Sequence, residues 1–415
     1  MASEEASAPE TAYRGAISRD VNLLAVFRGV SFLGDSLALV ALYLRVAPLG
    51  HAWAIAALAI ASSLPLVLLA PVAGLVADRV RAKPLLVGLG VVEALVCSSL
   101  GYWHSVPATI FLMFALSVVV AFSMPGYSAL VASITGTQHF TRAQGSLQSA
   151  QGVASILGPI LGGLLVGATG QSWPLYIDAI SFGLVALGTV FITHDRSPDP
   201  STRSSTKKDM MAGIMLIGHD SLLRPVIVNV FIFLLAVGTA NVAEVFYVTV
   251  TFHGSALAYG LVGASFGLGT IGGSLFASRL EHAQVKMTRS LTIAVVLVGV
   301  FMTGIGYVAN VKEIYPFMIL IGVAVGVANV TAMTLFAVRS PEHLRGRVFA
   351  ALSAVLTTAE IGATVVGGAV LSVIAPRSVF RLGGGIATLT AVVFGVLAIR
   401  ASRETFELEL GSQGD

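Results

Sequence analysis

Charged residues are scarce in this sequence. Asp, Glu, Lys and Arg together make up 11% of its 415 residues, while hydrophobic residues make up 56%. An average soluble domain carries roughly a quarter charged residues. Such a composition excludes a chain whose surface lies mainly in water, and it indicates a protein that is surrounded by lipid.

Cysteine and enzyme motifs are scarce as well. The single cysteine, Cys97, cannot form an internal disulfide, and we interpret it as a small apolar filler rather than a redox group. The glycines of "GLGTIGG" at 267–273 lie inside a hydrophobic run with no preceding strand, which excludes a dinucleotide loop. With no nucleotide loop, metal cluster or nucleophile motif, we expect no enzyme activity, no cofactor and no metal.

Long hydrophobic runs are abundant. Each has about the length that a helix needs to cross roughly 30 Å of hydrocarbon. They cover residues 22–46, 53–77, 84–103, 107–131, 145–168, 174–194, 226–251, 259–280, 288–308, 314–338, 348–374 and 379–400. The 44 glycines suit such helices, because small residues let membrane helices approach closely. The sequence therefore predicts an all-α membrane protein with twelve transmembrane helices.

The positive charges indicate the orientation of these helices. Most of the 24 Lys and Arg residues fall in connections on one side, whereas Lys312, Arg377 and Arg381 fall on the other. The positive-inside rule then places both termini in the cytoplasm. The net charge of +3 follows from this topology, so we expect no nucleic-acid partner.

The longest polar stretch divides the chain into two halves. We predict a cytoplasmic tail at 1–21, a six-helix half at 22–194, a cytoplasmic linker at 195–225, a second six-helix half at 226–400 and a cytoplasmic tail at 401–415. Met210, Met211 and Ile214 lie at helical spacing behind two lysines, which suits an interfacial helix within the linker. A disordered connector is an equal alternative for the first part of the linker.

The halves also repeat each other faintly. "RAQG" at 142–145 precedes paired glycines at 162–163, and "RGRV" at 345–348 precedes paired glycines at 367–368. Such repetition is typical of a transporter built from two pseudo-symmetric halves with its binding site between them.

A charged stretch, "GLVADRVRAK" at 74–83, lies between the second and third runs. It resembles the loop signature of the major facilitator superfamily, with matches at Gly74, Asp78, Arg79 and Lys83. Arg81 and Ala82 depart from that signature. We expect Gly74 to let two helices touch and Asp78 to bind N–H groups at a neighbouring helix N-terminus. The resemblance implies that these four residues latch the two halves together on the cytoplasmic side in one conformation.

A second stretch, "GSLQSAQGVASILGPILGG" at 145–163, resembles the fifth-helix motif of antiporters in the same superfamily. Gly145, Gly158, Pro159 and Gly162 match it, and Ala154 replaces one glycine. Pro159 should bend the helix, and Gly158 and Gly162 should give close packing. In that family the motif accompanies export rather than uptake.

Further patterns, including "FRGVSFLGDSL" and "YIDAISF", resemble the branch with macrolide-efflux proteins and bacterial enterobactin exporters. The resemblance implies the major facilitator fold, a bacterial-type cytoplasmic membrane, a small-molecule substrate and function as a monomer. The arginine that many proton-coupled exporters carry in the fourth span is missing, so proton coupling must depend on other residues.

Ionisable residues inside membrane spans are costly and are functional candidates by default. They are Arg28, Asp35, Glu93, Asp178, Glu244 and Glu360. Asp35 is our first choice for the proton-binding carboxylate, with Glu360 and Glu244 as further candidates and Arg28, two turns away, acting on Asp35. A structural role for Asp35 is the alternative. We interpret Asp178 as a helix cap near the outer surface and Glu93 as a residue of a peripheral span.

Aromatic and amide residues on the spans that line the cavity in this superfamily suggest the substrate. They include Phe32, Phe114, Asn229, Phe233, Asn241 and Asn329. Such a lining suits a lipophilic or amphipathic molecule such as a drug, a macrolide-like compound or a siderophore. The predicted function is proton-coupled export. The alternatives are an importer or uncoupled facilitator of the same fold and, from another class, a membrane scaffold or sensor that transports nothing.

Overall fold

The computed structural model describes residues 7–47, 52–192, 215, 218, 220–279, 284–340, 345–371 and 373–411. Within these residues, twelve helical segments are long and apolar enough to cross a membrane, which confirms the predicted spans. The interfacial helix predicted around residues 210–217 lies largely outside the described residues.

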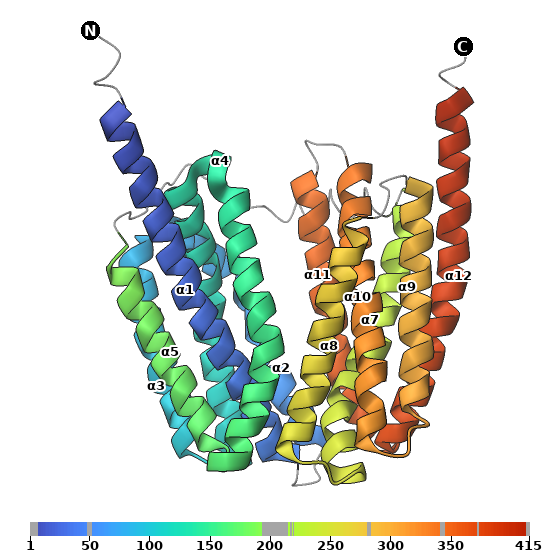
Figure 1. Cartoon of the computed structure of the whole chain (residues 1–415), viewed down its shortest axis with the longest axis horizontal. Coiled ribbons are helices and arrows are strands. Elements are labelled where there is room, and N and C mark those ends of the chain that lie inside the picture. The colour runs from blue at the N-terminus through green and yellow to red at the C-terminus, as the bar shows by residue number, and fades with distance from the viewer. Residues whose placement is uncertain are drawn as a thin grey trace. The chain divides into compact units, whose positions relative to one another are not determined.

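The N-terminal half consists of long helices that run alongside one another (Figure 1). They are α1 (Ser7–Val46), α2 (Ala52–Arg79), α3 (Ala82–Tyr102), α4 (Val106–Thr169) and α5 (Ser172–Val190). Helix α3 packs against both α4 and α5. Helix α1 begins at Ser7, well before the predicted run at 22–46, and α2 ends at Arg79, within the charged stretch at 74–83.

Helix α4 differs from the prediction. The fourth and fifth spans, Val106–Thr135 and Ala150–Thr169, belong to one continuous helix, and residues 136–149 between them are helical rather than a loop. That connection contains two glycines and no proline, so no residue in it forbids a helix. In Figure 1 the helix turns at the end that lies beside its label.

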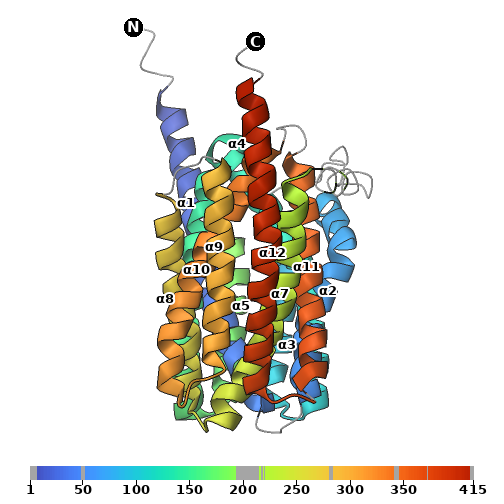
Figure 2. The same cartoon turned by 90° about the vertical axis from the view of Figure 1, so that its right-hand side faces the viewer.

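The C-terminal half is a second bundle. Its elements are α7 (Leu223–Phe246), a π-helical turn (Tyr247–Thr251), α8 (Ala256–Ala277), α9 (Gln284–Ile305), α10 (Val311–Arg339), α11 (Arg345–Leu371) and α12 (Pro376–Gly411). Helix α12 packs against α9 and α7, as Figure 2 shows, and α10 packs against α8 and α9. Helix α11 packs against α7.

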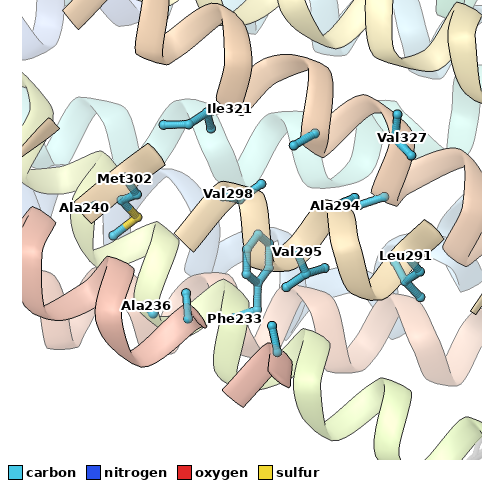
Figure 3. Packing of buried hydrophobic residues seen from close by; sticks show 14 of the residues in the cluster. Phe233, Ala236, Ala240, Leu291, Ala294, Val295, Val298, Met302, Ile321 and Val327 are labelled. Atoms are coloured by element: carbon cyan, nitrogen blue, oxygen red, sulfur yellow. The ribbon is translucent and has the colours of Figure 1, made fainter. Parts of the chain in front are cut away.

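The chain divides into two compact units. One contains Met1–Arg45 and Ala61–Ser204, and the other contains Val46–Ile60 and Ser205–Asp415. Each has its own apolar core. In the C-terminal unit, Phe233 of α7 packs among Val295, Val298 and Met302 of α9 (Figure 3). In the N-terminal unit, Leu24, Leu86, Leu130 and Val185 bring four helices together.

Glycines bring α8 and α10 into direct backbone contact. A side chain at Gly269 would overlap the carbonyl oxygen of Ile319, and one at Gly322 would overlap that of Phe266. Gly273 and Gly326 are equally tight one turn further along. The paired glycines at 267–273 therefore include a helix-packing surface of the kind that small residues form in membranes.

Candidate functional site

The polar residues of the N-terminal half surround α1, which packs closely against its neighbours. A side chain at Gly158 of α4 would overlap the Cβ of Ser36, and one at Gly162 would lie 3.1 Å from the Cβ of Val40. Gly188 of α5 lies equally close to the ring of Phe27. The close packing predicted at Gly158 and Gly162 is confirmed, and its partner is the segment of α1 that carries Asp35.

Arg28 and Asp35 lie in the middle part of the span that α1 forms. Asp35 is exposed within its unit, whereas Arg28 is half-buried. The guanidinium carbon of Arg28 lies 4.6 Å from the ring centroid of Phe32 and 4.5 Å from that of Tyr127 on α4. In the part of the chain that the structure describes, no carboxylate forms an ion pair with Arg28. Its charge nevertheless interacts with that of Asp35 through space.

Asp178 lies inside α5 and is 1% exposed. Its Oδ2 lies 3.3 Å from Cys97 Sγ on α3, and its Oδ1 lies 3.2 Å from Ser181 Oγ. The backbone of α1 at Gly34 is so close that a side chain there would meet Asp178 Oδ1 at 2.5 Å. Our interpretation of Asp178 as a helix cap is wrong, because α5 begins at Ser172 and its N-cap residue is Gln171.

Glu93 of α3 is also buried, with 3% of its surface exposed. Its Oε1 accepts a hydrogen bond of 2.6 Å from Ser123 Oγ on α4. Glu93 lies one turn before Cys97 on the same face of α3, and Cys97 contacts Asp178. We call Asp35, Glu93 and Asp178 the carboxyl cluster. The sequence identifies all three as intramembrane ionisable residues, but our interpretation assigned Asp178 to a helix cap and Glu93 to a peripheral span and did not place them together.

The carboxylates of the C-terminal half are more isolated. Glu244 is half-buried on α7 and Glu360 is exposed on α11. Neither side chain forms a hydrogen bond or ion pair with another residue of the described segments. The structure thus concentrates intramembrane charge in the N-terminal half, on the helices that pack around α1.

The predicted substrate residues fall into two groups. Phe114, Asn241 and Asn329 are exposed, and Phe32 is half-buried against Arg28. Phe233 and Asn229 are buried. The ring of Phe233 lies in the core between α7 and α9, and its place in a substrate cavity stays a prediction.

The predicted latch lies where α2 ends and α3 begins. Arg79 is exposed, and Lys83 Nζ donates a hydrogen bond of 2.5 Å to the carbonyl of Ile192 after α5. The expected close contact at Gly74 is absent, since no other described helix lies within 4 Å of the position of a Cβ there. The Asp78 side chain and the surroundings of Gly145 lie outside the described residues.

The polar side chains of the described segments do not have the arrangement of a metal centre. Within the described segments, no group of three or more His, Cys, Asp or Glu side chains is arranged to hold a metal ion. What the carboxyl cluster can hold chemically is protons, because carboxyl, thiol and hydroxyl groups exchange them.

Comparisons with known proteins agree with this architecture. The family model of the Major Facilitator Superfamily matches residues 24–247 and 226–411. The chain is 23% identical to a "Multi-drug resistance efflux pump PmrA homolog" of Lactococcus lactis, over 91% of this chain and 95% of that protein. It is 26% identical to "Enterobactin exporter EntS" of Citrobacter koseri, over 63% of this chain and 64% of the exporter.

A solved structure shares the fold. The crystal structure of the nucleoside transporter NupG superposes with a TM-score of 0.67 at 14% identity, covering 91% of this chain and 98% of that one. Twelve apolar helices and matches to the family model in both halves lead to one conclusion. The chain is a multi-pass membrane protein that belongs to the Major Facilitator Superfamily of transporters.

Proposed function

We propose that this transporter exports a small lipophilic or amphipathic molecule in exchange for protons. The observation that carries the proposal is Asp35, a carboxyl that is exposed within a membrane span and follows Gly34, whose backbone lies against the buried carboxyl of Asp178. A charged group in that position is costly unless it is wetted, paired or neutralised. A residue that alternates between the charged and the neutral form can therefore link proton movement to a change of conformation.

Export is supported by the relatives and by one motif. Two of the relatives are named as an enterobactin exporter and a multidrug efflux pump. Gly158 and Gly162, of the antiporter-type motif, pack directly on the segment of α1 around Asp35. Phe32, Phe114, Asn241 and Asn329 would contact an amphipathic substrate, and a drug, macrolide-like compound or siderophore has that character.

In the proposed cycle, Asp35 binds a proton from outside and releases it inside while the substrate moves outward by alternating access. Arg28 would favour the ionised form of Asp35 in the inward-open state. The latch of Gly74, Asp78, Arg79 and Lys83 would close the cytoplasmic side. We further propose that both termini are cytoplasmic, that the membrane is a bacterial inner membrane and that a single chain suffices.

The decisive experiment measures internal pH in sealed vesicles that contain the purified protein under an imposed proton gradient. Lipophilic drugs and siderophores are added to the wild type, to Asp35→Asn and to Asp35→Glu, which keeps the carboxyl. We expect substrate-dependent proton movement in the wild type, its loss in Asp35→Asn and partial retention in Asp35→Glu. Proton movement that Asp35→Asn leaves unchanged would transfer the coupling role to Glu360 or Glu244.

The same vesicles separate the alternatives. An importer or an uncoupled facilitator would move substrate down its gradient independently of pH, and Asp35→Asn would leave that flux intact. A scaffold or sensor would move no substrate in any variant. Either outcome would contradict proton-coupled export.

A further inference from the structure

The carboxyl of Asp178 contacts one thiol and one hydroxyl, and each of these groups also lies within hydrogen-bond distance of a backbone carbonyl. Cys97 Sγ lies 3.3 Å from both Asp178 Oδ2 and the carbonyl oxygen of Leu175. Ser181 Oγ lies 2.7 Å from the carbonyl oxygen of Asp178 and 3.2 Å from its Oδ1. A thiol and a hydroxyl carry one hydrogen each, and carbonyl oxygens only accept. Two hydrogens therefore serve four contacts.

A proton on the carboxyl would add a third hydrogen, which is enough for three of these four contacts. Ser181 would donate to the carbonyl at 2.7 Å, which is the shorter of its two contacts, and the protonated Oδ1 of Asp178 would donate to Ser181 Oγ. Oδ2 would then accept from Cys97, or the thiol would donate to Leu175. The contacts around Asp178 thus suit the neutral acid better than the carboxylate.

The surroundings also disfavour an ionised Asp178. The charged and titratable groups that act on it are Asp35 on α1 and Glu93 and Cys97 on α3. The cation nearest to this cluster along α1, Arg28, stacks between Phe32 and Tyr127. Burying an ionised carboxylate away from a cation is costly, and adjoining carboxylates oppose one another's ionisation.

Gly34 links this buried acid to Asp35. Its backbone lies against Asp178 Oδ1, and Asp35 is the next residue of α1. Asp35 is exposed within its unit, whereas Asp178 is enclosed by α1, α3 and α5. The cluster thus places an exposed carboxyl and an enclosed one on either side of a single glycine.

We propose that Asp178 is a second proton-binding residue of this transporter and that Asp178 and Asp35 bind protons as a pair. This inference rests on the proton-coupled export proposed above. While Asp35 is ionised, Asp178 holds a proton; when Asp35 gains a proton from one side, the pair holds two and can release one to the other side. One proton enters and one leaves, so the pair returns to its single-proton state.

Infrared spectroscopy of the purified protein in lipid tests the protonation directly, without any substrate. The C=O stretching band of a protonated carboxyl is distinct from that of a carboxylate, and the S–H stretching band of this protein belongs to Cys97, its single cysteine. At neutral pH we expect the wild type to show a carboxylic acid band that is lost in Asp178→Asn. Cys97→Ala, which removes one hydrogen-bond donor, should shift that band.

The matched variant Asp35→Asn tests the pairing. It should retain the acid band of Asp178 but change the pH range over which that band disappears, because the neighbouring charge has been removed. An acid band that Asp178→Asn leaves at full intensity would overturn the protonation of Asp178. An unchanged pH range in Asp35→Asn would overturn the pairing.

The vesicle experiment distinguishes a failure of the proposed proton-coupled export from a failure of the proposed role of Asp178. Proton movement that Asp35→Asn abolishes, combined with an acid band unaffected by Asp178→Asn, would uphold export and refute this inference. Absence of proton movement in the wild type would refute the proposed function, and a band lost in Asp178→Asn would then mark a structural acid rather than a transport residue. If Asp178→Asn does not fold, the band shift in Cys97→Ala decides the protonation.

Discussion

Gly273 of α8 lies directly against the backbone of Val323 on α10, so closely that a side chain at Gly273 would overlap the carbonyl oxygen of Val323. The contact is reciprocal, because Gly326 of α10 meets the backbone of α8 at Thr270 in the same way. We call this contact between α8 and α10, made by Gly269, Gly273, Gly322 and Gly326, the α8–α10 seam. Direct contact between backbones gains dispersion energy along it, and such packing is a main source of helix association in lipid.

This seam predicts a sharp contrast between two adjacent glycines. Gly273→Ala should force α8 and α10 apart and destabilise the protein by about 1–3 kcal/mol, because the backbone atoms it meets cannot rotate away. Gly272→Ala should be harmless, since nothing lies within 4 Å of its Cβ position. Thermal unfolding of both variants in detergent measures the difference, and equal midpoints would contradict the seam.

A second pair of glycines tests the contact between α4 and α1. Gly158→Ala would collide with Ser36, beside Asp35, whereas Gly152→Ala meets nothing within 4 Å. We expect Gly158→Ala to reduce substrate-driven proton movement in vesicles several-fold, because it displaces the segment that carries Asp35. Gly152→Ala should behave like the wild type. If both variants transport normally, this contact has no part in coupling.

Arg45 should contribute to stability through the hydrogen bonds that its buried guanidinium donates to three backbone carbonyls. It is 7% exposed and donates hydrogen bonds to the carbonyls of Leu100 at 2.7 Å, Trp103 at 3.2 Å and Gln171 at 3.5 Å. Arg45→Met would leave those carbonyls without their donor, at a cost of about 1–3 kcal/mol. Arg45→Lys should recover part of this loss. If Arg45→Met unfolded at the same midpoint as the wild type, these hydrogen bonds would make no contribution to stability.

Asp220 should stabilise the start of α7 in two ways. Its Oδ1 accepts from the backbone N–H groups of Leu222 and Leu223, both at 2.9 Å, and its Oδ2 pairs with Arg339 Nε at 2.9 Å. Asp220→Ala should cost about 1–2 kcal/mol, mostly through the lost cap, because a partly exposed ion pair contributes less than about 1 kcal/mol.

Salt separates these two contributions. Asp220→Asn keeps an acceptor oxygen for the cap and loses the charge, so its deficit should shrink when the ionic strength is raised. The deficit of Asp220→Ala should largely persist. Unfolding midpoints at low and high salt provide the comparison, and a deficit of Asp220→Ala that disappears in high salt would show that the ion pair dominates.

The helices could be predicted because lipid imposes a minimum length and excludes unpaired backbone groups. The run predicted at 84–103, for example, corresponds to α3 at Ala82–Tyr102. The same reasoning failed between the fourth and fifth spans, because polarity marks where a helix leaves the membrane but does not require the helix to end there.

The carboxyl cluster could not be predicted for a different reason. Asp178 and Cys97 are 81 residues apart, and their contact depends on the rotation of α3 and α5 about their own axes. Composition and spacing within one helix contain no information about that rotation. The burial of Phe233 could not be predicted for the same reason, since an aromatic residue on a cavity-lining helix suits the core equally well.

The burial of Cys97 makes this transporter convenient to label. Its thiol is 0% exposed and contacts Leu175 and Asp178, and buried cysteines of this kind are inert toward thiol reagents. A cysteine introduced at an exposed position between spans, such as Ser105 in the N-terminal half or Val373 in the C-terminal half, would then be the one reactive thiol. Paired probes at such positions could follow the motion of the two halves during transport while the native Cys97 and its contacts with α5 stay in place.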